Sequence, residues 1–115
     1  MLSGCSPDLP EGTWLRATDL RQSPVHYNSS PSLEVVALSE AEWRYGDERI
    51  SGERLLDVAR MSAELLPQPV LIVDFSALTP AQRRRSMRDI AVAAKCTPEH
   101  RRCVEGTRQE FLRRT

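Results

Sequence analysis

Val70-Leu71-Ile72-Val73-Asp74-Phe75 is a short, mostly apolar run with a helical pattern on each side of it. It is too short for a typical helix, and it is bounded by Pro67-Gln68-Pro69 before it and by Ser76-Ala77-Leu78-Thr79-Pro80 after it. Its β-branched content and its lack of polar alternation are typical of a strand that is buried on both faces. We therefore expect a strand that runs parallel to a neighbour and is covered by helices.

A helical pattern precedes this strand. Ser51 is a favourable N-cap residue, and Glu53 stands in the first turn, where the helix dipole favours negative charge. Apolar and small residues then recur at steps of three and four, which predicts an amphipathic helix of about four turns that ends at Pro67. Its expected buried face consists of Leu55, Val58, Ala59, Ser62, Leu65 and Leu66.

A second helical pattern follows the strand. Thr79-Pro80-Ala81-Gln82 places a threonine at the N-cap, a proline at the first helical position and a glutamine three residues after the cap. This arrangement is typical of a capping box. The expected buried stripe is Met87, Ile90, Ala91 and Ala94.

Four arginines occupy much of the opposite face of that helix: Arg83, Arg84, Arg85 and Arg88. Such a cluster can hold phosphates, anionic lipid headgroups or an acidic partner, and it can equally be a solvated helix face. No aromatic residue interleaves the arginines, and Phe111 is the only aromatic residue after Phe75. This pattern argues against a platform for nucleic acid.

The remaining elements complete the predicted fold. Residues 33–38 form a strand candidate, and Trp43 and Tyr45 alternate with charged residues in a second one, before a turn and a short strand at Arg49-Ile50. A third helix is expected from Pro98, and the pattern leaves the final residues open between helix and strand. The fold class is α/β (α+β), with a small sheet of about three to four strands and two or three helices packed on it. We expect an anchor and extended tether in residues 1–32 and a single small α/β domain in residues 33–115.

The chain is short, and its charged residues are distributed unevenly along it. The chain has 115 residues and a formal net charge of zero, but the charge is polarised along it. Residues 1–75 carry six basic and twelve acidic groups, whereas residues 76–115 carry ten basic and four acidic groups. No apolar stretch is long enough to span a bilayer as a helix.

Leu2-Ser3-Gly4-Cys5 resembles the lipobox of bacterial lipoproteins, in which the cysteine thiol is acylated. The polar, turn-rich residues 6–12 follow it, as expected of a tether between a lipid anchor and a folded domain. The resemblance implies an export leader ahead of Met1. The alternative is that Cys5 is an ordinary free thiol in a polar tail.

The cysteine count agrees with this interpretation. If Cys5 carries lipid, Cys96 and Cys103 remain as a pair that can be bridged across a turn in an oxidising compartment such as the periplasm. Two buried, reduced thiols are an equal alternative. A metal site of Cys96, His100 and Cys103 is a weaker one, because this spacing matches no standard zinc pattern and supplies only three ligands.

The order of elements in residues 33–95 resembles the periplasmic domain of the ExbD/TolR biopolymer-transport family. The similarity involves the turn and serine in residues 45–51, the strand in residues 68–74 and the end of the following helix at Ala94-Lys95. Members are accessory subunits of envelope machines driven by the proton-motive force, so the resemblance implies a domain that can dimerise and contacts partner proteins or the cell wall. The family's acidic transmembrane helix has no counterpart here, so no proton-transfer residue is carried over.

Three functions follow from these observations. The first is a non-enzymatic envelope lipoprotein, membrane-anchored in the periplasm through Cys5 and without a cofactor. Its domain would bind an envelope protein or cell-wall component through Arg83, Arg84, Arg85 and Arg88. The second is a cytosolic regulatory or nucleic-acid-binding protein that uses the same arginines. The third, a redox or metal enzyme built on Cys96, His100 and Cys103, lacks both a Cys-X-X-Cys motif and an orienting carboxylate.

Overall fold

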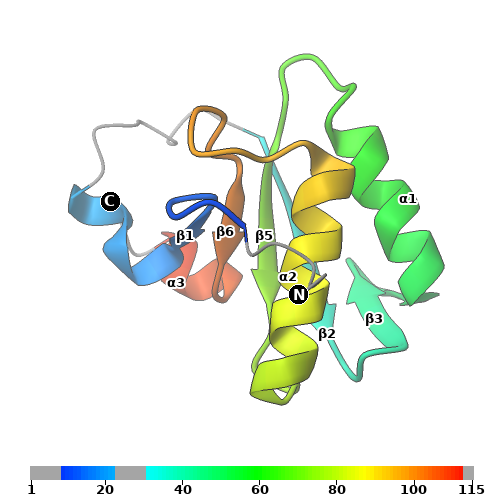
Figure 1. The fold of residues 1–115 in the computed structure, drawn as a ribbon. Coiled ribbons are helices and arrows are strands. Elements are labelled where there is room, and N and C mark those ends of the chain that lie inside the picture. Colours follow the sequence, from blue (N-terminus) through cyan, green and yellow to red (C-terminus); the bar gives the residue numbers. More distant parts are fainter. Residues whose placement is uncertain (1–8, 23–30, 113–115) are drawn as a thin grey trace, which may run out of the picture.

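The computed structural model describes residues 9–22 and 31–112, and these form one six-stranded sheet with helices on both faces (Figure 1). In chain order the elements are β1 (Trp14–Arg16), the 3-10 helix η1 (Ala17–Gln22), β2 (Ser32–Ala37), β3 (Glu42–Tyr45), β4 (Glu48–Ser51), α1 (Gly52–Ser62), β5 (Val70–Asp74), α2 (Pro80–Ala94), β6 (Cys103–Glu105) and α3 (Arg108–Leu112).

The apolar stretch forms β5 near the middle of the sheet, as predicted. The strand order is β1-β6-β5-β2-β3-β4, and β5 pairs in parallel with β2 on one side and β6 on the other. Leu71, Ile72 and Val73 are completely buried. Residues 70–73 of the strand are apolar because helices or loops cover both of its faces.

The expected sheet of three to four strands was too small. The two missed strands are β1 and β6, which pair in parallel with each other. Each has only three residues, Trp14–Arg16 and Cys103–Glu105, so neither is long enough to show a period-two pattern. Their extended state depends on the hydrogen bonds they make with neighbouring strands, which is a property of the assembled sheet.

Two apolar clusters fill the space on the two sides of the sheet. On one side, α1 and α2 pack against each other and on the strands, over Leu71 and Val73 of β5 (Figure 1). The other side holds a smaller cluster in which Ala17 of η1 and Phe111 of α3 join residues of β5 and β6. Alternate residues of β5 thus enter different clusters, because successive side chains of a strand point to opposite faces.

Both predicted helix caps are present. The Ser51 hydroxyl accepts a hydrogen bond from the Arg54 N–H, and Thr79 and Gln82 form a reciprocal capping box. The prediction for the end of the first helix was wrong, however, because α1 stops at Ser62 after 11 residues. Residues 65 and 66, expected on its buried face, are exposed. After Ser62 the backbone N–H groups of Ala63 and Glu64 donate to the Arg60 and Met61 carbonyls, three residues back, so the helix ends in a tight turn.

The C-terminal region also differs from expectation. No helix begins at Pro98; instead Thr97 and His100 close a turn through backbone hydrogen bonds, and the chain enters β6. The final apolar pair, Phe111-Leu112, lies in the short helix α3. The cap-then-proline signal at residues 97–98 therefore starts a turn, because the chain must reverse within a few residues to reach the sheet.

Part of the stretch expected as anchor and tether lies in the folded body, because β1 and η1 fall within residues 14–22. The Trp14 indole N–H donates to the Met87 carbonyl in α2 at 3.0 Å, which ties the sheet edge to that helix. The Trp14 ring also meets Phe75 edge to face, with ring centroids 5.4 Å apart. In the described part of the chain, no helix is both long enough and apolar enough to cross a bilayer.

Candidate functional site

Cys96 and Cys103 lie at the distance of a disulfide bond, with their sulfur atoms 2.10 Å apart and their Cα atoms 6.0 Å apart. Cys96 directly follows the left-handed C-cap residue Lys95 of α2, and Cys103 opens β6. Both side chains are buried. The bridge thus connects the end of a helix to the strand that the helix leads into.

The other two cysteine hypotheses concern a metal site at Cys96, His100 and Cys103 and a lipid on Cys5. Within residues 9–22 and 31–112, no three His, Cys, Asp or Glu side chains gather where they could hold a metal ion. His100 is exposed at the turn between the two bridged cysteines. The lipobox cysteine, Cys5, lies outside the described residues.

The four arginines of α2 have different surroundings and do not form one continuous cluster. Arg85 binds Glu40 through two hydrogen bonds, of 2.9 and 3.2 Å, and Arg88 contacts its neighbour Asp89 at 3.4 Å. Arg83 pairs with Glu105 of β6. Arg84 is exposed and forms no ion pair with any described residue.

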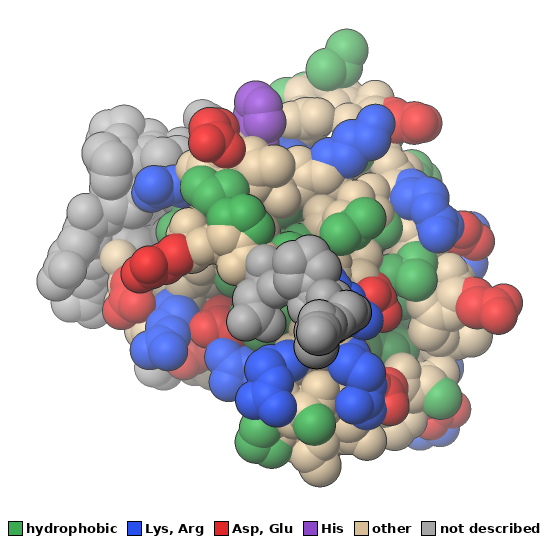
Figure 2. Space-filling view, in the orientation of Figure 1, with side chains coloured by type: hydrophobic (Ala, Val, Ile, Leu, Met, Phe, Trp, Pro, Cys, Tyr) green, Lys and Arg blue, Asp and Glu red, His purple; other side chains and the backbone are tan. Residues whose placement is uncertain are grey.

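Three of these arginines border a groove of about 470 Å³ between α2 and the segment of residues 9–14. Figure 2 shows basic side chains gathered on this face of the molecule. The groove is also lined by apolar groups, among them Leu9, Trp14 and Met87. We call this surface the arginine groove; its arginines are Arg84, Arg85 and Arg88. It combines positive charge with an apolar lining, which suits a partner that has both acidic and apolar groups.

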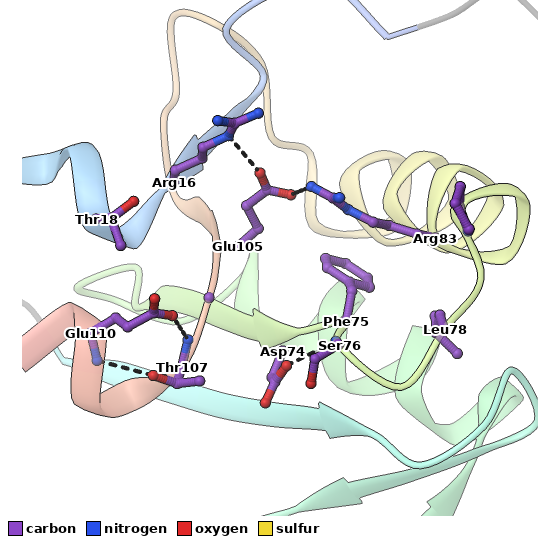
Figure 3. Close-up of a pocket in the computed structure, with 12 residues that line it drawn as sticks. Arg16, Thr18, Asp74, Phe75, Ser76, Leu78, Arg83, Glu105, Thr107 and Glu110 are labelled. Atoms are coloured by element: carbon purple, nitrogen blue, oxygen red, sulfur yellow. Dashed lines mark hydrogen bonds and ion pairs between the residues drawn. The ribbon is translucent and has the colours of Figure 1, made fainter.

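A second hollow, of about 410 Å³, lies where β1, β5 and β6 end (Figure 3). Since these strands are parallel, their carboxyl ends meet at one edge of the sheet, which is a common position for ligand sites. We call it the edge pocket. Its lining includes Arg16 from β1, Asp74 from β5, Arg83 from α2, Glu105 from β6 and Glu110 from α3.

Glu105 lies on one side of the edge pocket between two arginines. One of its carboxylate oxygens accepts from Arg16 Nε at 3.3 Å, and the other accepts from Arg83. The Glu105 side chain is only 12% exposed, whereas those of Arg16 and Arg83 are 70% and 43% exposed. The carboxylate therefore holds two partly exposed guanidinium groups at the rim of the pocket.

Two other carboxylates lie across the pocket from this trio (Figure 3). Asp74 accepts from the Ser76 backbone N–H at 2.9 Å, and Glu110 accepts from the Thr107 backbone N–H at 2.8 Å. Neither forms an ion pair with a described residue. The pocket thus has a side with two cations around one anion, and a side with two unpaired anions.

Arg102 is the described group whose pKa is clearly shifted, since burial lowers the pKa of its guanidinium from the ordinary value. This side chain donates to the Pro69 carbonyl at 2.8 Å and to the Ala94 carbonyl at the end of α2. Its position between a loop and a helix end indicates a structural role.

The sequence interpretation missed the roles of Arg16 and Glu105 in the edge pocket. Both residues end three-residue strands, whose pairing no pattern revealed. A usable signal existed at Asp74, because a polar residue that ends a buried parallel strand lies at the edge where ligand sites form. The partners of Asp74 depend on which strands lie beside β5.

No family model matches the chain, and neither a curated protein nor a solved structure resembles it significantly. The functional argument therefore depends on the residues and contacts described above.

Proposed function

We propose that this protein is a non-enzymatic bacterial cell-envelope lipoprotein. In this proposal Cys5 carries the lipid, and the folded domain lies in the periplasm as an interaction module of the ExbD/TolR type, accessory to envelope transport or integrity. The domain binds an acidic segment of an envelope partner in the arginine groove.

The Cys96–Cys103 pair is the observation that best supports a location in the periplasm. Its sulfur atoms lie at bonding distance, and such bonds persist in oxidising compartments, whereas cytosolic thiols are kept reduced. Pairing these two cysteines leaves Cys5 as the odd one, which is the residue that the lipobox resemblance assigns to acylation. The bridge and the lipobox resemblance therefore both favour the periplasmic side of the membrane.

The arginine groove is the surface best suited to a partner. Arg84 has no ion-pair partner among the described residues, and Arg88 contacts only the adjacent Asp89, so both can bind new carboxylates. Arg85 is already held by Glu40, so it contributes less. Apolar lining from Trp14 and Met87 would add affinity that charge alone does not supply.

The anchor is tested by fractionation of cells that express the gene with its native upstream codons. Wild-type protein is expected in the membrane fraction, and Cys5→Ala in the soluble fraction. Ser6→Ala is the control and should stay with the membrane. Identical fractionation of wild type and Cys5→Ala would contradict the lipoprotein proposal.

The groove is tested with poly-L-glutamate as an acidic probe and tryptophan fluorescence as the readout. We expect salt-sensitive binding that is lost in Arg84→Glu/Arg88→Glu. A matched control, Arg44→Glu/Arg54→Glu, changes the same charge at exposed positions on β3 and α1 and should bind normally. Tighter binding of single-stranded DNA that depends on Arg84 and Arg85 would instead favour the cytosolic nucleic-acid-binding function.

A further inference from the structure

We propose that the edge pocket is a second binding site, separate from the arginine groove, and that it takes a small zwitterion. The ligand class is a molecule with one carboxylate and at least one ammonium group, such as a free amino acid or a short peptide with free ends. The pocket lies at the carboxyl edge of the sheet and has room for such a molecule, at about 410 Å³.

The Arg16–Glu105–Arg83 trio is suited to a carboxylate. Each guanidinium has five N–H donors, and Glu105 uses only one from each arginine. No other hydrogen bond joins either side chain to a described residue, so both retain free donors at the pocket rim. Because Glu105 restrains both side chains, a ligand carboxylate meets two arginines that are already in place, which lowers the entropic cost of binding.

The opposite side is suited to an ammonium group. Asp74 and Glu110 are half-buried, and each accepts one backbone hydrogen bond through one oxygen. Their other oxygens accept no hydrogen bond from the described residues. A carboxylate in this state is a strong acceptor for an N–H donor that carries positive charge.

The charges of the two sides select the ligand class. The trio has two guanidinium groups and one carboxylate, whereas the opposite side has the two carboxylates of Asp74 and Glu110 and no basic group. A simple anion would meet the carboxylates, and a simple cation would meet the arginines. Only a molecule with both charges satisfies both sides, so the pocket should discriminate against compounds with one charge.

The closing experiment is an NMR titration that follows the backbone amides of Ser76, Gly106 and Thr107. The probes are alanine, lysine and alanyl-alanine, and the single-charge comparisons are acetate and methylamine. Saturable shifts are expected with at least one zwitterion, and about tenfold weaker binding with both single-charge compounds. A response to alanine identifies free amino acids as sufficient, whereas a response to the dipeptide alone identifies peptide ends.

Two variants test whether the zwitterion binds in the edge pocket. Asp74→Asn is nearly isosteric and keeps the acceptor for Ser76, yet it removes the charge expected to bind ammonium. It should weaken zwitterion binding about tenfold, and Asp47→Asn, an exposed position in the β3–β4 turn, should leave it unchanged. The absence of saturable shifts with every zwitterion would overturn the proposal, and so would equal binding of acetate or an unaffected Asp74→Asn. None of these outcomes involves Cys5 or the arginine groove.

Discussion

Arg83 in α2 and Glu105 at the end of β6 form an ion pair that joins residues 22 positions apart. The contact fastens the first turns of the helix to the carboxyl edge of the sheet. Glu105 is the less exposed member and also binds Arg16 from β1. One carboxylate therefore links a helix and two neighbouring strands.

The Arg83–Glu105 pair should stabilise the fold more than an exposed pair does. A double-mutant cycle with Arg83→Gln and Glu105→Gln is expected to give a coupling free energy of about 1 kcal/mol, measured by urea denaturation. The Arg60–Asp57 pair on α1 is the control, because both of its side chains are more than half exposed. Its coupling should be about 0.3 kcal/mol. Equal coupling free energies for the two pairs would show that the low exposure of Glu105 does not strengthen its ion pair.

The Cys96–Cys103 bridge should raise the free energy of unfolding. It closes a short loop, with a sequence separation of seven, for which the chain-entropy model gives about 2.5 kcal/mol. Cys96→Ala/Cys103→Ala should lose roughly this amount, and reductant should destabilise the wild type but not the variant. Cys5→Ser is the control for loss of a thiol. Unlipidated protein that is denatured without reductant should react as one free thiol, and three reactive thiols under these conditions would contradict the bridge.

Arg102 should contribute to stability through its two carbonyl partners. In Arg102→Met the Pro69 and Ala94 carbonyls lose their charged donor, so we expect the free energy of unfolding to fall by about 2 kcal/mol. Arg84→Met makes the same change at an exposed position without a described partner, and its stability should change by less than about 0.5 kcal/mol. The measurement is thermal or chemical denaturation, and similar values for the two variants would refute this role.

Gly106 should tolerate no side chain. Its φ is +139°, and an added Cβ would lie 2.8 Å from Ala17 Cβ, so Gly106→Ala combines backbone strain with a clash. We expect a loss of about 3 kcal/mol, measured by urea denaturation. Gly46→Ala is the matched control, because it also has a positive φ, of +60°, but open space around the added atom. It should lose about 1 kcal/mol, so an equal loss at both positions would mean that the contact with Ala17 is unimportant.

Local chemistry made the helix starts and the central strand predictable. Ser51 and Thr79 cap their helices through hydrogen bonds to residues three positions away, so the signal and its partner lie in the same short window. β5 is apolar enough to identify alone, whichever strands lie beside it. The end of α1 was misplaced because Leu65 and Leu66 continue the apolar spacing after the helix has stopped.

The distribution of the arginines was not predictable in the same way. Arg83, Arg84 and Arg85 are consecutive in the sequence, yet their surroundings differ. Arg83 binds Glu105 at the edge pocket, Arg85 binds Glu40, and Arg84 is exposed without an ion-pair partner among the described residues. Their partners come from β6 and from the loop before β3, far away in the sequence. A charge cluster counted along a helix therefore overestimates the positive surface that is available to a ligand.

The order of amino acids was enough to predict the central strand, the two capped helices, the option of pairing Cys96 with Cys103 and the charge of α2. The reason is that these features depend on contacts within a few residues or on composition. The folded arrangement was needed to show that β1 and β6 are strands and that Arg16, Asp74 and Glu105 line one pocket. A three-residue strand is held by hydrogen bonds to strands that are distant in sequence, so its position exists only once the sheet has assembled.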